Sequence, residues 1–198
     1  MDANPSAARP WIEEAAPQFT TLIDQDHQVA TLYNMVNVPQ AVWIDEQGMI
    51  VRPTETGGSL DILREFDFSA GAFPDNATQR SQATKQRYLQ AVESWVLEGD
   101  ASPYLLSAEQ IQARTPKMTE QVAEAHVVFR LGQYLARQGS AQEAQALFAK
   151  ARELHPDSWN MFRETTERMD NGIAAGPEFW EKVMALSEDE AYYAPIDL

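Results

Sequence analysis

Hydrophobic and polar positions in the first part of the chain change between helical and strand spacing. Residues 6–16, which end before Pro17, have an apolar stripe at helical spacing and predict a helix. Residues 19–23 are rich in strand-forming side chains, and residues 28–35 again place apolar side chains on one helical face. The expected order is therefore helix, strand, helix. The stripe of the first helix consists of Trp11, Ile12, Ala15 and Ala16.

Residues 38–51 predict a β-hairpin, with the sequence Val-Pro-Gln-Ala-Val-Trp-Ile-Asp-Glu-Gln-Gly-Met-Ile-Val. The apolar run 40–44 is the first strand, and residues 45–48 form a tight turn in which the glycine takes the left-handed position. Residues 49–51 return antiparallel. Pairing is expected to end at Arg52-Pro53, because proline has no N–H to donate to a ladder.

Helices dominate the pattern beyond this hairpin. Residues 59–68 and 78–97 predict two helices, the second with an apolar side made of Tyr88, Leu89, Val92, Trp95 and Val96. Ser107 and Gln110 form a capping box at the start of a short helix. Thr115-Pro116 is expected to open the longer helix that follows. The tail 191–195 is expected to dock in extended form on the body of the protein.

A second motif occupies residues 125–158, where large and small apolar residues recur at a spacing that resembles one tetratricopeptide repeat. Its residues are Val128, Leu131, Gly132, Leu135, Ala144, Phe148, Ala151 and Pro156. The small residues let two antiparallel helices approach, and Ser140 with Glu143 predicts a capping box after the turn. Residues 78–97 and 159–169 are expected to cover its faces, because one repeat cannot bury both. A generic helical hairpin is the alternative.

The runs 19–24, 29–34 and 38–51 together resemble the carboxyl half of thioredoxin-like oxidoreductases. The related groups are the alkyl hydroperoxide reductase and thiol-specific antioxidant proteins and the cytochrome-maturation thioredoxins. The resemblance implies that Val38-Pro39 is a cis peptide that shapes a substrate groove by presenting backbone groups to an extended peptide. The alternative is that Pro39 only marks the turn into the strand.

The reactive half of such a redox site is absent from the sequence, since the chain has no cysteine. The resemblance implies that a cysteine- or selenocysteine-bearing segment precedes Met1. A selenocysteine codon read as a stop, followed by an internal start, would produce such a truncation. The strand 40–44 would then expose an apolar edge and pair with another chain or a second copy.

Composition narrows the classes of function. The formal net charge of −15 is spread over both halves of the chain, which argues against nucleic-acid binding. No apolar run approaches a membrane span and no signal peptide is seen, so a cytoplasmic protein is expected. Three dispersed histidines predict no metal site, and no catalytic residue or cofactor is assigned. Asp24, Asp26 and His27 suggest an acid–base cluster but are better explained as helix caps.

The predicted fold class is α/β plus α. Residues 1–70 are expected to form an incomplete thioredoxin-like domain, and residues 77–198 an all-helical, tetratricopeptide-like domain. The leading hypothesis for function is a part of a thiol or selenol oxidoreductase, with Val38 and Pro39 in the substrate groove. The alternative is a non-catalytic module that binds a protein or peptide through its helices, and a third is a structural remnant without independent function.

Overall fold

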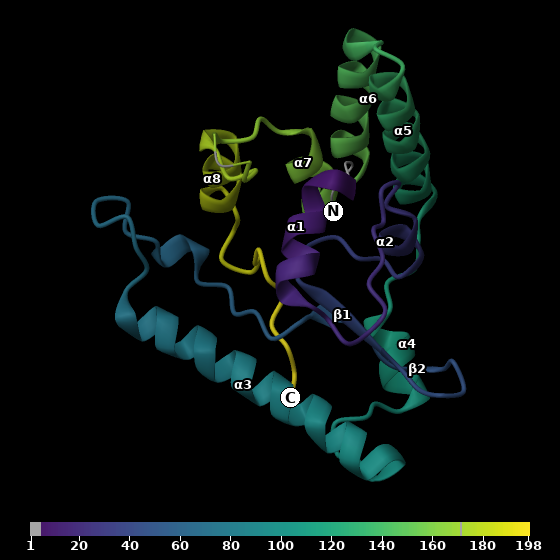
Figure 1. Ribbon diagram of the computed structural model, residues 1–198, viewed down its shortest axis with the longest axis vertical. Coiled ribbons are helices and arrows are strands. Elements are labelled where there is room, and N and C mark those ends of the chain that lie inside the picture. The colour runs from purple at the N-terminus through teal and green to yellow at the C-terminus, as the bar shows by residue number, and fades with distance from the viewer. Residues whose placement is uncertain (1–4, 171) are drawn as a thin grey trace. The chain divides into compact units, whose positions relative to one another are not determined.

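The computed structural model describes residues 5–170 and 172–198 and mixes helices with one small antiparallel sheet (Figure 1). This agrees with the predicted class at the level of an α/β part and helical parts. The strands are β1 (Gln40–Ile44) and β2 (Ile50–Thr56). The helices are α1 (Pro5–Ala15), α2 (Gln28–Leu32), α3 (Asp75–Glu98), α4 (Ala108–Arg114), α5 (Glu120–Arg137), α6 (Ala141–Leu154), α7 (Trp159–Thr165) and α8 (Pro177–Met184), with short 3-10 turns η1 (Leu63–Glu65) and η2 (Gly99–Ala101).

The chain packs as two compact units that are each discontinuous in sequence. The first unit combines the described residues up to Val36 with Met118–Met161, and the second combines Asn37–Lys117 with Phe162–Leu198. The predicted division into 1–70 and 77–198 does not coincide with these units. The difference arises because the chain leaves the first unit just before the β-hairpin and returns to it for α5 and α6.

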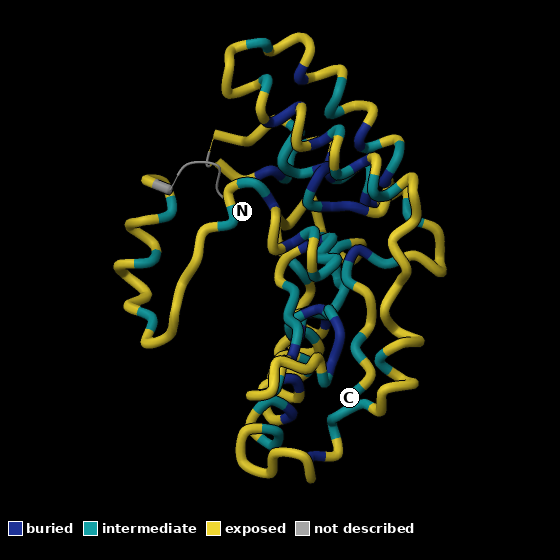
Figure 2. The backbone as a smooth tube through the Cα atoms, turned by 90° about the vertical axis from the view of Figure 1, so that its right-hand side faces the viewer, coloured by how far each residue is buried: buried dark blue, intermediate teal, exposed yellow. Residues whose placement is uncertain are grey.

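The first unit is built on the antiparallel pair α5 and α6, which lie side by side in Figure 1. Gly132 makes their close approach possible, because a Cβ at this position would lie 2.7 Å from Cε1 of Phe148. Ala144 is likewise buried. Along both helices buried positions alternate with exposed ones (Figure 2). The core consists of Ala125, Phe129, Ala151 and Met161, with Val128, Phe148 and Leu154 packed against it.

The predicted helical hairpin is therefore present, but its caps differ from the prediction. α5 begins at Glu120 behind an N-cap at Thr119, whose hydroxyl accepts from the Val122 N–H, and not at Thr115-Pro116. The Ser140 side chain makes no capping hydrogen bond, so the predicted second capping box is wrong. At α4 the predicted box of Ser107 and Gln110 is confirmed, with both reciprocal hydrogen bonds formed.

The β-hairpin of the second unit begins at the predicted residue. β1 has the predicted bounds, and the Asp45 carboxylate accepts from the N–H groups of Gln47 and Met49 within the turn. Gly48 has a φ of 79°, as this turn requires. β2 continues past Pro53 to Thr56, so the predicted end of pairing is wrong. The register shifts between the Ala41 and Trp43 pairs, and this irregularity lets the ladder pass the proline.

The core of the second unit lies between the hairpin and α3. Trp43, Tyr88 and Ala91 are buried, and Trp43 stacks on Trp95 at a centroid distance of 5.1 Å. α3 therefore covers the sheet and belongs to the second unit, whereas the α5–α6 pair that it was expected to cover belongs to the first. Its buried face follows positions 88, 91, 92 and 95, whereas Leu89 and Val96 are exposed, contrary to the expected apolar side.

Two local predictions fail, and the predicted first helix is confirmed. Residues 19–23 form no strand, since the only described sheet pairs β1 with β2, and Phe19 and Leu22 stay about three-quarters exposed. The predicted helix 59–68 is reduced to η1, since the Asp67 carboxylate accepts from the Ser69 and Ala70 N–H groups and starts a turn. α1 forms close to its predicted bounds, but Trp11 in its apolar stripe remains 73% exposed.

Two further helices are shorter than predicted. The helix expected over 28–35 ends at Leu32, where a turn follows, and the helix expected over 159–169 ends at Thr165. Among the described residues, no helix is both long enough and apolar enough to cross a membrane.

Candidate functional site

The surface predicted from sequence lies at Val38 and Pro39, at the entry to β1. The peptide bond between them is cis, as the family resemblance implies, and both side chains are exposed. The Val38 N–H donates to Oδ1 of Asn37 over 2.8 Å, and the Val38 carbonyl accepts from the Tyr193 hydroxyl over 3.1 Å. The Pro39 carbonyl accepts from the Gly57 N–H. The backbone groups that the resemblance would offer to a peptide are thus bonded within the chain.

The tail predicted at residues 191–195 docks on the rest of the second unit, but it bends at Tyr192 and Tyr193 and is therefore not extended throughout as predicted, and its contacts continue to residue 198. The Tyr192 N–H donates to the Asp61 carboxylate over 2.8 Å, and the Tyr192 carbonyl accepts from Nδ2 of Asn37 over 2.7 Å. The Ala194 carbonyl accepts from the Thr56 hydroxyl over 3.1 Å. Three backbone groups of the tail, two of Tyr192 and one of Ala194, are therefore held by side chains of the rest of the unit.

Aromatic packing anchors the same tail. The Tyr192 ring is 4% exposed, meets the Phe179 ring edge-on at a centroid distance of 5.5 Å, and its hydroxyl accepts from Nη1 of Arg163. Burial raises the pKa of Tyr192 and raises the pKa of Tyr193 to about 12, so both hydroxyls keep their protons at neutral pH. Tyr193 can therefore donate to Val38 throughout the physiological range.

Arg52 joins the hairpin to the tail beneath this surface. Its side chain is 1% exposed and makes a bidentate ion pair with the Glu55 carboxylate, at 2.9 Å from Nε and 2.8 Å from Nη2. The same guanidinium donates to the backbone carbonyls of Tyr104 and Asp197, and its Cζ lies 5.4 Å from the centroid of the Trp43 ring. Because all of these contacts are internal, Arg52 has a structural role.

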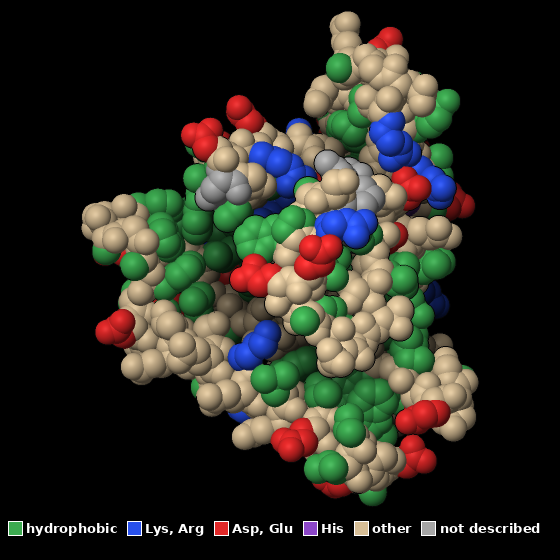
Figure 3. Space-filling view, viewed as in Figure 1, with side chains coloured by type: hydrophobic (Ala, Val, Ile, Leu, Met, Phe, Trp, Pro, Cys, Tyr) green, Lys and Arg blue, Asp and Glu red, His purple; other side chains and the backbone are tan. Residues whose placement is uncertain are grey.

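Hydrophobic side chains gather over the loop after η1 and over α8 in Figure 3. Phe66 stacks on Trp180 at 5.2 Å and meets Phe68 and Phe73 edge-on. Phe68 remains 59% exposed. This aromatic cluster packs α8 against the loop through the contacts of Phe66 and Phe68 with Trp180.

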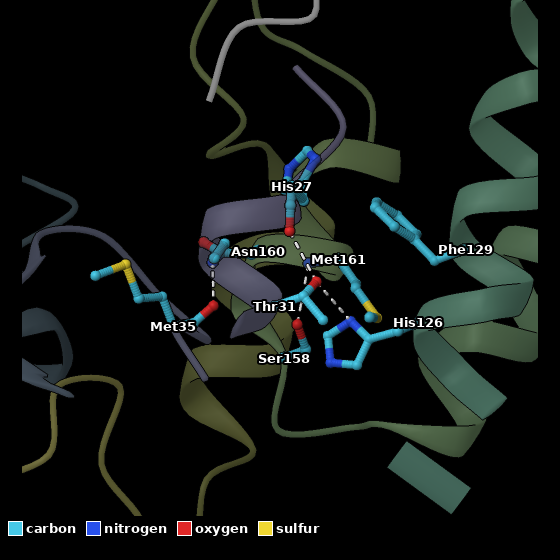
Figure 4. Close-up of a pocket in the computed structure, with 9 residues that line it drawn as sticks. His27, Thr31, Met35, His126, Phe129, Ser158, Asn160 and Met161 are labelled. Carbon is cyan, nitrogen blue, oxygen red and sulfur yellow. Dashed lines mark hydrogen bonds between the residues drawn. The ribbon is translucent and has the colours of Figure 1, made fainter. Parts of the chain in front are cut away.

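The first unit contains a histidine-lined cavity that sequence reasoning missed (Figure 4). The three histidines, far apart in sequence, come together there: His27 and His126 line the cavity, and the His126 ring lies 5.8 Å from that of His155. This cavity holds about 10 Å³ and shares lining residues with a larger hollow of about 190 Å³. Apolar side chains of Leu32, Val127 and Phe129 line the larger hollow beside Asp26 and Arg130.

Hydrogen bonding fixes the roles of these rings. The Thr31 hydroxyl donates to the His27 carbonyl over 2.7 Å, so its contact with Nδ1 of His126, at 3.2 Å, requires a proton on that nitrogen. Nε2 of His126 is then a buried acceptor without a partner among the described residues. A histidine that donates to a hydroxyl cannot also deprotonate it. Thr31 and His126 therefore do not form a nucleophile–base pair in this arrangement.

Burial keeps the histidines neutral. It lowers the pKa of His27 to about 4, against the opposing effect of the nearby Asp24 and Asp26 carboxylates, and it lowers the pKa values of His126 and His155. Nδ1 of His27 faces Nε2 of Gln133 at 3.2 Å and accepts from that amide. A neutral His27 thus carries its proton on Nε2.

The acid–base cluster considered at residues 24–27 is resolved into structural contacts. Both carboxylate oxygens of Asp24 accept from backbone N–H groups of α2, those of Gln28 and Ala30, as the capping interpretation predicts. Asp26 pairs with Arg137 at 3.1 Å. Within the described ranges, no group of three or more His, Cys, Asp or Glu side chains is arranged to hold a metal ion.

Comparison with known proteins gives no assignment: no family model, no curated protein and no solved structure matches this chain. The site therefore has to be interpreted from its own geometry.

Proposed function

We propose that this chain supplies the substrate-binding part of a thioredoxin-like thiol or selenol oxidoreductase. The observation that carries the proposal is the exposed Val38-Pro39 segment at the head of a β-hairpin whose opposite side is packed on α3. In this position an extended peptide can lie along Val38 and reach its carbonyl once the Tyr193 hydroxyl has left it. The nucleophile has to come from outside these residues, because the chain has no cysteine.

The chemistry assigned to the chain is positioning. The segment would hold the backbone of a disulfide-bearing peptide in extended form so that its sulfur faces a thiolate or selenolate of the reactive part. That nucleophile attacks one sulfur, a mixed disulfide or selenosulfide forms, and the other sulfur leaves as a thiolate. Val38 and Pro39 contribute orientation and no proton transfer.

The experiment compares two proteins in reduction of insulin disulfides by dithiothreitol. One is the 198-residue chain, and the other is the longest in-frame product encoded by the DNA that includes these residues. We expect catalysed reduction by the longer product and none by the chain alone. The proposal fails if the upstream DNA encodes no in-frame strand with a CxxC- or CxxU-type helix start, or if the longer product is inactive.

Val38 gives a sharper test within the active product. Val38→Lys places a flexible charged chain on the peptide path and is expected to raise KM for insulin about tenfold, which corresponds to about 1.4 kcal/mol, with little change in kcat. The matched control is Val96→Lys, at an exposed position of α3. An unchanged KM in Val38→Lys would remove Val38 from the substrate path.

A second candidate function, protein binding through the helical hairpin, is favoured by an exposed apolar stripe on α5. Val127, Leu131 and Tyr134 recur at helical spacing and are 69%, 48% and 52% exposed. A single helical hairpin leaves such a face without the neighbour that stacked repeats provide. The occupant that we propose for that face is a hairpin of the same kind from a second copy of this chain.

Sedimentation velocity over a concentration series tests this second function. Self-association that Leu131→Glu abolishes, and that Leu97→Glu at an exposed site of α3 leaves intact, would support it. A monomer at all concentrations, or association that is insensitive to Leu131→Glu, would rule out stacking between copies.

A further inference from the structure

The tail is held by Asn37, Thr56, Asp61 and Arg163, and the surface that they form is called here the groove. The contacts that these residues make indicate which other peptides the groove would accept. Asp61, Asn37 and Thr56 contact the N–H of Tyr192, the carbonyl of Tyr192 and the carbonyl of Ala194, which are all main-chain groups. Any peptide that follows the same path has such groups, so these three contacts, called here the backbone clamp, do not depend on the tail's side chains. Asn37 and Thr56 are each only 3% exposed, which fixes their donor atoms in place.

Tyr192 is the one buried residue among 191–198 and sets the main side-chain requirement, beside the contacts that the side chains of Ile196 and Leu198 make with the core. The ring of Tyr192 fills a site formed by Phe179 and Arg163, with edge-on ring packing on one side and a hydrogen bond from the guanidinium on the other. Such a site favours an aromatic side chain with a hydroxyl, because an aliphatic residue there would leave Arg163 with one hydrogen bond fewer.

The groove also includes the predicted substrate position. The Tyr193 hydroxyl donates a hydrogen bond to the Val38 carbonyl. The tail therefore occupies a backbone acceptor that an incoming peptide would use. Downstream, the Arg114 side chain pairs with the Asp197 carboxylate at 2.8 Å and Arg87 donates to the Leu198 carbonyl. The occupied stretch therefore runs continuously from Tyr192 to Leu198.

We propose that the tail is a tethered occupant of a peptide-binding groove, and that the groove takes, in its place, a peptide segment that follows the same bent path and has a tyrosine at the position of Tyr192. This inference rests on the proposed function, since it names the class of substrate segment and the regulation of the same site. Tethering gives the tail a high effective concentration, so an external peptide binds only in proportion to the fraction of molecules whose tail is released.

The experiment measures binding of a fluorescein-labelled peptide with the sequence of residues 189–198 to the full chain by fluorescence anisotropy. Tyr192→Ala weakens the tail but leaves the clamp intact, and is expected to bind the peptide at least tenfold more tightly than the unmodified chain. Adding Asn37→Ala to Tyr192→Ala removes a clamp donor and is expected to reverse most of that gain. The matched control is Phe19→Ala, at an aromatic residue of the first unit that is 76% exposed, and this variant should bind as the unmodified chain does.

Equal binding by the unmodified chain and Tyr192→Ala would overturn the proposal, and so would an Asn37→Ala/Tyr192→Ala protein that binds as tightly as Tyr192→Ala. Tyr193→Phe is the second variant, because it removes one hydroxyl and preserves the ring if Tyr192→Ala does not fold. It is expected to bind the peptide about fivefold more tightly, the equivalent of one ordinary hydrogen bond, and no change would overturn the proposal.

Peptide binding needs no redox chemistry, so the two proposals fail separately. If Tyr192→Ala strengthens peptide binding but insulin is not reduced, the oxidoreductase proposal fails and the groove proposal stands. If insulin is reduced but Tyr192→Ala does not change peptide binding, the groove proposal fails and the oxidoreductase proposal stands.

Discussion

At the scale of single residues, Gly132 sets how closely α5 and α6 approach. A Cβ here would meet two atoms of the Phe148 ring at 2.7 and 2.8 Å, distances that packing does not tolerate. Gly132→Ala is therefore expected to destabilise the protein by about 1–3 kcal/mol, despite the higher helix propensity of alanine. Urea unfolding followed by circular dichroism measures the effect. Adding Phe148→Leu should recover part of the loss, and a stabilised Gly132→Ala would contradict the close contact.

Arg52 is a charge that the fold has buried completely. Its removal leaves the Glu55 carboxylate and the carbonyls of Tyr104 and Asp197 without their donor. Arg52→Ala is expected to cost about 3–5 kcal/mol in the free energy of unfolding. Arg9→Ala, which breaks an exposed pair with Glu13, should cost about 0–1 kcal/mol in the same denaturation experiment. Similar losses in both variants would argue against the buried pair.

His27 gives stability a pH dependence of predictable sign. Its folded pKa of about 4 lies below the ordinary 6.5, so the unfolded chain binds the proton first as pH falls. The contribution of neutral His27 to the free energy of unfolding is complete above pH 6.5. About 3 kcal/mol of this free energy is lost as the pH falls from 6.5 to 4. Asp24 and Asp26 oppose this shift, and His126 reinforces it. Urea unfolding at several pH values gives the free energy of unfolding as a function of pH. Between pH 6.5 and 4 this free energy should change less steeply with pH in His27→Gln than in the unmodified chain, and an identical pH dependence would contradict the prediction.

At the scale of elements, capping chemistry can be compared between two helices with the same apparent signal. Ser107 forms a complete capping box at α4, whereas Ser140 at α6 makes no capping hydrogen bond. Ser107→Ala should therefore weaken α4 by about 1 kcal/mol, and Ser140→Ala should change α6 by less than about 0.5 kcal/mol. Hydrogen exchange of the Ile111 and Ala144 amides, which donate to the capping carbonyls, reports each helix separately. Equal effects would show that capping does not distinguish them.

Helices and strands were predictable where they depend on residues a few positions apart. They were less predictable where they depend on contact with an element distant in sequence. The strand 40–44 and the α4 cap depend on residues a few positions apart and were predicted at their observed positions. Residues 19–23 have strand-forming side chains but no strand to pair with. Which face of α3 is buried depends on Trp43, some 45 positions away from Tyr88, and was predicted only in part.

At the scale of the whole molecule, the discontinuous units make the predicted helical domain incomplete by itself. A fragment of residues 77–198 keeps α3 but loses Trp43, the ring on which Trp95 stacks and whose Nε1 donates to the Tyr88 hydroxyl. We expect this fragment to show red-shifted tryptophan fluorescence and no cooperative unfolding of α3. A fragment whose tryptophan emission and unfolding midpoint equal those of the full chain would support the sequential division instead.

The candidate site likewise has features that the sequence predicted and features that depend on contacts between distant residues. Val38 and Pro39 could be selected from sequence because a family resemblance marks the segment, and the docking of the tail was expected. The occupant of the Val38 carbonyl could not be selected, since Tyr193 lies 155 positions away. The proximity of the three histidines was also not predicted, because they are far apart in sequence and no motif spacing links them.

The sequence by itself determined the local architecture: a hairpin between two strands, a long helix after it, and two antiparallel helices held close by Gly132 and Ala144. These follow from side-chain periodicity, turn residues and caps, which act over a few positions. Only the tertiary structure decided that α3 covers the hairpin, that Arg52 is buried, and that the tail fills the groove at Val38. Such contacts depend on which apolar faces meet, and the local pattern leaves that choice open.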